Sequence, residues 1–146
     1  MSRPPQNQEP PQERPGAILI AGPTASGKSA LAFSALRRAE LLGLAAFLVA
    51  ADQVLVRREG ARLLASPPPA LAGQIELSGV GILAEPFLAE AELTLLVDLA
   101  EANRIERLPE SGTATLLGVA LPRLVLPARE AAFGADVLQR FAMHQR

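Results

Sequence analysis

The segment of residues 22–29 holds the side chains best suited to chemistry in this chain. It reads GPTASGKS and matches G-x-x-x-x-G-K-[ST], the pattern typical of loops that bind phosphate groups. Backbone N–H groups in such a loop surround a phosphate chain, and its glycines allow close approach. We expect the Lys28 ammonium to reach the β- and γ-phosphates and the Ser29 hydroxyl to coordinate Mg²⁺. The predicted cofactor-binding residues are Gly22, Thr24, Ala25, Ser26, Gly27, Lys28 and Ser29.

This loop needs a strand before it and a helix after it. Residues 17–21 form a short apolar run between two glycines, which predicts a buried strand. Residues 29–42 carry apolar side chains among Arg37, Arg38 and Glu40, and they predict a helix that begins near Lys28. The helix would add the positive end of its dipole to the loop. Strand, loop and helix therefore stand in the order that phosphate binding requires.

Composition restricts the class of protein. The 146 residues are 49% hydrophobic, enough for one domain with one core, and the net charge is −1. We therefore do not expect a nucleic-acid partner. Cysteine is absent and no apolar run reaches the roughly 20 residues of a membrane span, so we expect a cytoplasmic protein without a membrane partner. Residues 1–15 are rich in Pro and Gln and are expected to form a disordered tail, with the folded domain at 16–146.

The segment between the first helix and residue 66 predicts three strands. Residues 44–50 form an apolar run that reads as a second buried strand, with Asp52 just beyond its carboxyl end, where ligands gather in open α/β sheets. Residues 53–56 and 61–65 are expected to form a hairpin that turns at 57–60. Three consecutive prolines at 67–69 then interrupt regular structure.

The second half of the chain predicts further strands and one helix. A short strand with Glu76 lies between Gly73 and Gly79, and residues 93–99 read as another strand. Residues 104–110 read as a loop, residues 121–127 as an edge strand between two prolines, and residues 128–143 as a closing helix. Helices are too few for regular strand–helix alternation. We therefore predict an α/β domain with a mixed, strand-rich sheet.

Several segments together resemble one family, the C-terminal catalytic domain of HPr kinase/phosphorylase in its short α-proteobacterial form. The similarity covers roughly residues 16–141. The glycine-flanked segment around Glu76, with the Asp52 segment upstream, is more specific than the phosphate-binding loop alone. The segments that carry the resemblance read GPTASGKS (22–29), LVAADQV (48–54), LAGQIELSGVGI (71–82), ERLPE (106–110) and LPRLVLP (121–127).

This resemblance implies an ATP-dependent kinase that phosphorylates a serine of the phosphocarrier protein HPr, and in many members also removes that phosphate. It implies a P-loop kinase domain related in fold to phosphoenolpyruvate carboxykinase. Lys28 would hold the β/γ-phosphates, and Ser29 with Glu76 would hold Mg²⁺. Asp52 would lie beside the attacking group, so Asp52 and Lys28 are the expected catalytic residues. Longer members form hexamers, which leaves a homo-oligomer open here.

Three departures from the family pattern bear on catalysis. The family usually has two adjacent aspartates where this chain has Ala51 and Asp52. Its Glu-x-Arg-Gly motif has Ser78 in place of the arginine here. The usual histidine-bearing strand before the loop is replaced by the Pro-rich tail, and the only histidine, His144, reads as a solvated terminal residue. A carboxylate and an arginine act on the transition state, not on phosphate binding.

Two functional hypotheses therefore remain open. In the first, the chain is an active HPr kinase with Asp52 as its sufficient carboxylate. In the second, it is an ATP-binding regulatory module with little or no catalysis. The opening of the loop is also similar to that of tRNA isopentenyl transferases, but the downstream motifs of that longer family are absent.

Three other charged residues have plain structural interpretations. Asp98 ends an apolar strand and reads as a strand-end cap or a solvated turn residue. Arg107 and Glu110 flank a proline in the predicted loop and read as a solvated pair. The family resemblance alone gives these two a functional interest.

Overall fold

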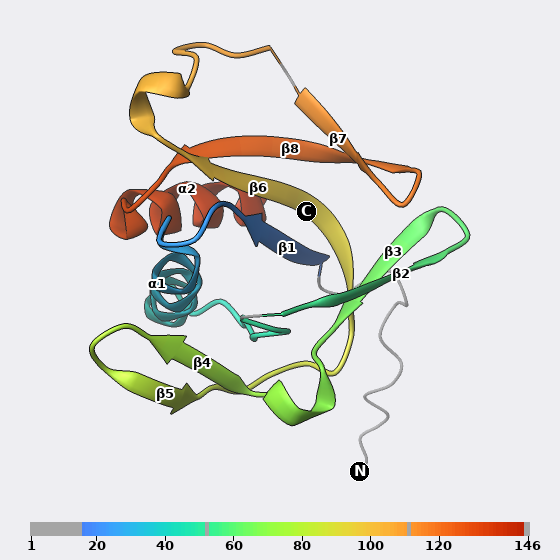
Figure 1. Ribbon diagram of the computed structural model, residues 1–146, viewed down its shortest axis with the longest axis vertical. Coiled ribbons are helices and arrows are strands. Elements are labelled where there is room, and N and C mark those ends of the chain that lie inside the picture. The colour runs from blue at the N-terminus through green and yellow to red at the C-terminus, as the bar shows by residue number, and fades with distance from the viewer. Residues whose placement is uncertain (1–15, 52, 111, 145–146) are drawn as a thin grey trace.

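The protein has a mixed α/β architecture, seen in a computed structural model that describes residues 16–51, 53–110 and 112–144 (Figure 1). The tail 1–15, Asp52 and the side chain of His144 lie outside that description. The strands are β1 (Gly16–Ala21), β2 (Leu55–Glu59), β3 (Arg62–Ser66), β4 (Gln74–Leu77), β5 (Gly81–Ala84), β6 (Ala91–Ala100), β7 (Gly112–Leu116) and β8 (Val119–Pro127). The α-helices are α1 (Lys28–Leu41) and α2 (Ala131–His144), and short 3₁₀ turns lie at Pro69–Leu71 and Ala102–Arg104.

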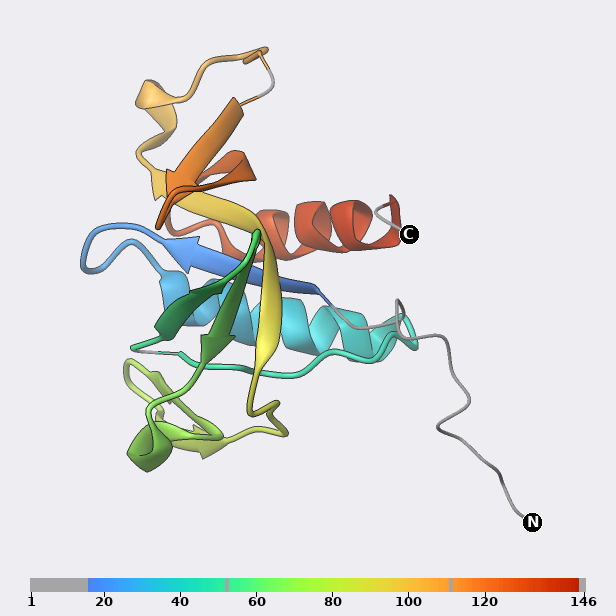
Figure 2. The same ribbon diagram turned by 90° about the vertical axis from the view of Figure 1, so that its right-hand side faces the viewer.

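Six strands form one mixed sheet around β6. Its order is β2-β3-β6-β8-β7, and β1 also pairs with β6. β1 and β8 run parallel to β6, whereas β2, β3 and β7 join by antiparallel pairing. β4 and β5 form a separate hairpin that contacts α1 (Figure 2). The predicted mixed, strand-rich α/β class is confirmed.

Both helices cover one face of the parallel part of the sheet, where they lie side by side (Figures 1 and 2). Leu31 of α1 and Leu138 of α2 are buried there against Leu95, Val97 and Leu99 of β6. The opposite face carries a second apolar cluster, which includes Leu63, Ala65, Leu93 and Leu121. The sheet therefore has apolar side chains on both faces, as parallel strands require.

A bulge in β6 changes which face each residue occupies. Ala17 pairs with Leu93 but Ile18 pairs with Leu95, so Thr94 is an extra residue in the ladder. Leu93 consequently faces the second cluster while Leu95 faces the helices, although both are odd-numbered. The burial of β6 alternates without a break in the sequence. The change of face is therefore invisible in the hydrophobic pattern.

The predicted strand at residues 44–50 is wrong. Gly43 has a φ of 74°, and the Leu44 N–H donates to the Ala39 carbonyl at 2.9 Å while the Gly43 N–H donates to Glu40. These bonds are those of a Schellman cap, so the start of the apolar run ends α1. Within the run, only Leu48 makes a bridge, with Phe87. Leu48 and Val49 are apolar because they cover the core, not because they pair in a sheet.

The prediction of 121–127 as an edge strand also needs correction. β8 lies between β6 and β7, so β7, not β8, is the edge strand at this end of the sheet. Pairing with β7 ends at Arg123 and pairing with β6 begins there. Pro122 lies where β8 pairs only with β7, and Pro127 lies where β8 pairs only with β6. The missing N–H of each proline therefore does not interrupt the hydrogen bonds on the other side of β8.

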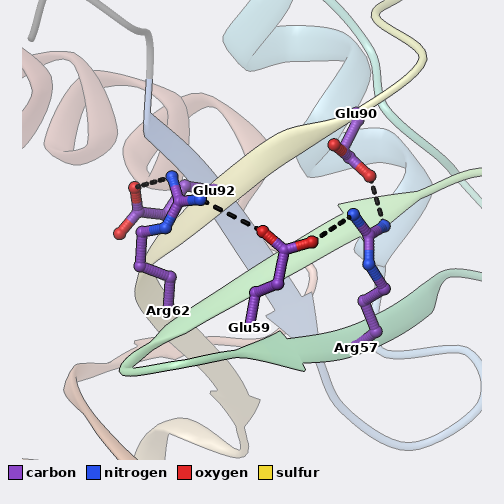
Figure 3. Close-up of polar contacts among 5 residues, drawn as sticks. All are labelled: Arg57, Glu59, Arg62, Glu90 and Glu92. Atoms are coloured by element: carbon purple, nitrogen blue, oxygen red, sulfur yellow. Dashed lines mark hydrogen bonds and ion pairs between the residues drawn. The ribbon is translucent and has the colours of Figure 1, made fainter.

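The other predicted elements are confirmed with small changes of boundary. β2 and β3 form the expected hairpin, but it turns at Gly60 and Ala61, not over 57–60. Charged residues tie this hairpin to the start of β6: Glu59 binds Arg57 and Arg62, which in turn bind Glu90 and Glu92 (Figure 3). The hydrogen bond from Arg57 holds the pKa of Glu59 below its usual value. Neither described helix has the length and apolar character needed to cross a bilayer.

Candidate functional site

The loop between β1 and α1 has the backbone conformation that its glycines allow. Gly27 has φ 92° and ψ 27° and is the residue before the helix, and Ala25 also has a positive φ of 67°. No side chain caps the helix N-terminus, and the Leu31 N–H is the first to bond back to Gly27. The N–H groups of the first turn of α1 therefore remain available to an anion.

Lys28 spans this loop. Its Nζ donates to the carbonyl of Gly22 at 2.9 Å and to that of Pro23 at 3.3 Å. The side chain thus folds back from the first residue of α1 to the start of the loop. One full positive charge and the positive end of the helix dipole lie together at the loop.

Ser26 lies inside the loop with an unused hydroxyl. Ser26 is 2% exposed, and among the described residues its Oγ is a buried side-chain oxygen without a hydrogen-bond partner. Leaving such a group unpaired is costly, which makes it a donor ready for a ligand atom. Ser29 is half-buried in the first turn of α1, and Thr24 and Ala25 are exposed. The structure therefore brings the sequence-predicted loop residues together at one place.

Gly22 is required by close packing. A Cβ at this position would lie 2.7 Å from Ser26 Oγ and 3.1 Å from Leu99 Cβ of β6. We expect Gly22→Ala to lower the free energy of unfolding by about 1–3 kcal/mol because the loop must shift. Urea denaturation of this variant and of Gly112→Ala, whose Cβ would meet nothing nearer than 3.8 Å, measures the effect. Equal stability of the two variants would contradict this packing argument.

The carboxyl ends of three parallel strands meet at the loop. β1 leads into the loop, β6 leads to Glu101, and β8 leads to Arg129. The Ala128 N–H donates to the Ala100 carbonyl at 2.8 Å, which joins the last two strand ends. Ligands in α/β sheets bind at this edge.

Arg129 and Glu101 are the residues that sequence reasoning missed. The Arg129 N–H donates to the Ser26 carbonyl at 3.0 Å, and its side chain donates to the Ala25 carbonyl and to Glu101. In the sequence, Arg129 is one arginine at the start of the helix predicted over 128–143, and Glu101 follows a predicted strand without any motif. Their only available signal was a position just after a strand.

Glu76 lies on β4, outside the main sheet. It is exposed, while the preceding Ile75 is fully buried. β4 contacts α1, the helix that begins with Lys28 and Ser29. Among the described residues, no three His, Cys, Asp or Glu side chains gather closely enough to hold a metal ion. A metal held here would thus need oxygens from outside this set.

A partly buried ion pair fixes the β4–β5 hairpin on α1. Arg37 Nη1 and Nη2 donate to both carboxylate oxygens of Glu85, at 2.8 and 3.0 Å. The Glu85 side chain is 6% exposed and that of Arg37 39%. The hydrogen bond from Arg37 lowers the pKa of Glu85. Glu85 also donates its N–H to the Gly73 carbonyl, so this pair positions the strand that carries Glu76.

Asp98, Arg107 and Glu110 are the remaining charged residues that the sequence singled out. Asp98 does not cap a strand end or lie in a turn as predicted: it lies inside β6, in register with Ala21 of β1, and pairs with Arg123. Arg107 and Glu110 are exposed in the predicted loop.

The described part of the chain is thus a mixed α/β domain with a strand–glycine loop–helix unit at the carboxyl edge of its parallel strands. Its fold is similar to that of a solved structure, the Hpr(Ser) kinase/phosphatase from Coxiella burnetii, with a TM-score of 0.70. The two chains share 21% sequence identity, and the match covers 89% of each. No protein-family model matches the sequence, and no curated protein is significantly similar to it.

Proposed function

We propose that this chain is an ATP-dependent serine kinase of the HPr kinase/phosphorylase family, with a P-loop domain over residues 16–146 related to phosphoenolpyruvate carboxykinase. The observation that carries the proposal is the Lys28 side chain, which folds back over the loop so that its Nζ donates to the Gly22 carbonyl, at the edge where three parallel strands end. The fold shared with the Coxiella burnetii enzyme supports it. The phosphocarrier protein HPr would be the acceptor.

The loop residues suit a nucleotide triphosphate. The unpaired Ser26 hydroxyl, the uncapped N-terminus of α1 and the Lys28 ammonium are all donors, and none of them is an anion. This donor set fits the β- and γ-phosphates of ATP. The proposed cofactor-binding residues remain Gly22, Thr24, Ala25, Ser26, Gly27, Lys28 and Ser29.

Mg²⁺ is compatible with the same site. Magnesium in phosphoryl-transfer enzymes takes one or two protein oxygens, with water and phosphate oxygens as its other ligands. Ser29 and Glu76 would hold it, and no cluster of three acidic residues is needed. When bound, the ion would neutralise charge on the phosphates. Lys28 would orient the phosphate chain, and Asp52 would accept the proton of the attacking serine hydroxyl.

A regulatory ATP-binding module is the second candidate. Ser78 lies exposed in the turn of the β4–β5 hairpin and offers no charge where the family motif has an arginine. Ala51 likewise offers no carboxylate beside Asp52. Both losses concern transfer and leave the loop donors intact, so binding without catalysis is consistent with these residues.

Transfer of labelled γ-phosphate from Mg-ATP to purified HPr separates the two candidates. We expect label on HPr with the native chain, none with Lys28→Ala, and a rate on the order of 100-fold higher with Ala51→Asp/Ser78→Arg, because these groups act on the transition state. Label from the restored variant alone would make the native chain a regulatory module. Absence of label from both would count against HPr as the acceptor or against the family assignment itself.

A further inference from the structure

Arg129 holds the second half of the loop through its backbone. Its N–H donates to the Ser26 carbonyl, and a Cβ on Gly27 would lie 3.4 Å from its N and Cα. The junction between β8 and α2 therefore packs directly on the residues that precede Lys28. Any residue other than proline could donate this N–H, so this contact does not explain the arginine side chain.

The conformation of Arg129 is unfavourable for an arginine. Its φ is 58°, in the left-handed region where only glycine, and to a lesser degree asparagine, lies without appreciable strain. Glycine or asparagine would make the same backbone bond with less strain. A strained non-glycine residue at a ligand-binding edge indicates a role for its side chain.

The guanidinium points along the loop. Its Nη1 donates to the Ala25 carbonyl at 3.4 Å, the outer limit of a hydrogen bond, and its Nη2 donates to Glu101 at 2.6 Å. Arg129 and Glu101 side chains are 57% and 55% exposed, so their pair is held weakly. Ser26, whose carbonyl accepts from the Arg129 N–H, also has a buried hydroxyl without a hydrogen-bond partner, which marks the loop interior as a place for a ligand atom.

We propose that Arg129 is a phosphate-contacting residue of the loop, a second cation beside Lys28, and that Glu101 competes with the phosphate chain for its guanidinium. This inference rests on the proposed function. It adds Arg129 to the residues that contact phosphate, and Glu101 as a residue that tunes the affinity for the nucleotide. On binding, the guanidinium exchanges an exposed carboxylate for phosphate oxygens, to which arginine donates in a bidentate manner.

Arg129→Asn tests this proposal because it retains the backbone donor and tolerates a positive φ. We expect the dissociation constants of ATP and of inorganic tripolyphosphate, measured by calorimetry, to rise about tenfold to 100-fold, with a melting temperature equal to or above that of the native chain. Glu101→Gln is expected to lower both constants severalfold. Arg62→Asn removes the same charge from β3 and is the matched control.

Each outcome is decisive. Native affinity in Arg129→Asn, together with lost affinity in Lys28→Ala, would overturn the role of Arg129 and leave the proposed function standing. If Arg129→Asn binds both ligands more weakly but also melts at a lower temperature, and Glu101→Gln binds no more tightly than the native chain, the role of Arg129 is merely structural. Failure of the native chain to bind either ligand would overturn both the phosphate site and this proposal.

Discussion

Lys28→Ala is expected to weaken ATP binding at least 100-fold while changing the free energy of unfolding by less than about 1 kcal/mol. The large effect arises because Lys28 supplies the ammonium that would contact the phosphates at the loop. The small effect on folding arises because its two bonds go to carbonyls of a partly exposed loop, which water can satisfy instead. Calorimetric titration and urea denaturation measure the two quantities separately.

The composition of the chain gives a second way to test this prediction. Lys28 is the only lysine, so an amine-reactive reagent can modify only this side chain and the N-terminal amine. We expect ATP to slow modification of Lys28 and to leave the N-terminal amine unaffected, as followed by mass spectrometry of the two peptides. Equal rates with and without ATP would contradict the placement of the phosphates on Lys28. In the ATP titration, Lys28→Arg keeps the charge at this position and is the control for simple electrostatics.

Arg37→Ala is expected to have the largest effect on stability, a loss of about 3 kcal/mol in the free energy of unfolding at neutral pH. It leaves the Glu85 carboxylate buried without its two charge-assisted donors. Glu85→Ala should cost less, about 2 kcal/mol, because Arg37 is the more exposed partner and keeps Glu40. Arg38→Ala is the matched control: its partner Asp136 is exposed, and a loss under about 1 kcal/mol is expected.

The stability difference between the native chain and Arg37→Ala should depend on pH. Because Arg37 lowers the pKa of Glu85 in the folded state, the pair stabilises the native chain above the ordinary glutamate pKa of about 4.3. That stabilisation is lost as the pH falls through the lowered value. In Arg37→Ala, protonation of Glu85 at low pH instead removes the cost of burying an unpaired carboxylate. The difference should therefore shrink between pH 5 and about pH 3, and a constant difference would contradict this assignment.

The sequence by itself determined the parts of the protein that depend on local chemistry. The glycine and lysine spacing of 22–29 placed a loop between a strand and a helix, and the structure has β1 and α1 at those places. The hairpin of β2 and β3, the short strand with Glu76 and the closing helix followed in the same way from turn residues and periodicity. These features form within a few residues of one another, so neighbouring side chains were sufficient to predict them.

Tertiary structure decided the features that depend on distant partners. Residues 44–50 look like a strand. In the structure, Leu44 completes the cap of α1, and within the run only Leu48 forms a bridge, with Phe87. Residues 121–127 look like an edge strand, but the first half of β8 pairs with β7 and the second half pairs with β6 on its other side. Which strands are neighbours is set by the packing of whole faces, and a strand has the same side-chain alternation whether or not a neighbour lies beside it.

The site shows the same division. The loop donors could be identified from one segment, whereas Glu101 and Arg129 reach that loop from the ends of β6 and β8, 28 residues apart in the chain. Their meeting depends on parallel pairing of these strands with register Ala100 to Pro127, which brings both carboxyl ends to the same edge. No local pattern encodes that register, because it results from the fit of two helices and a bulged strand around one core.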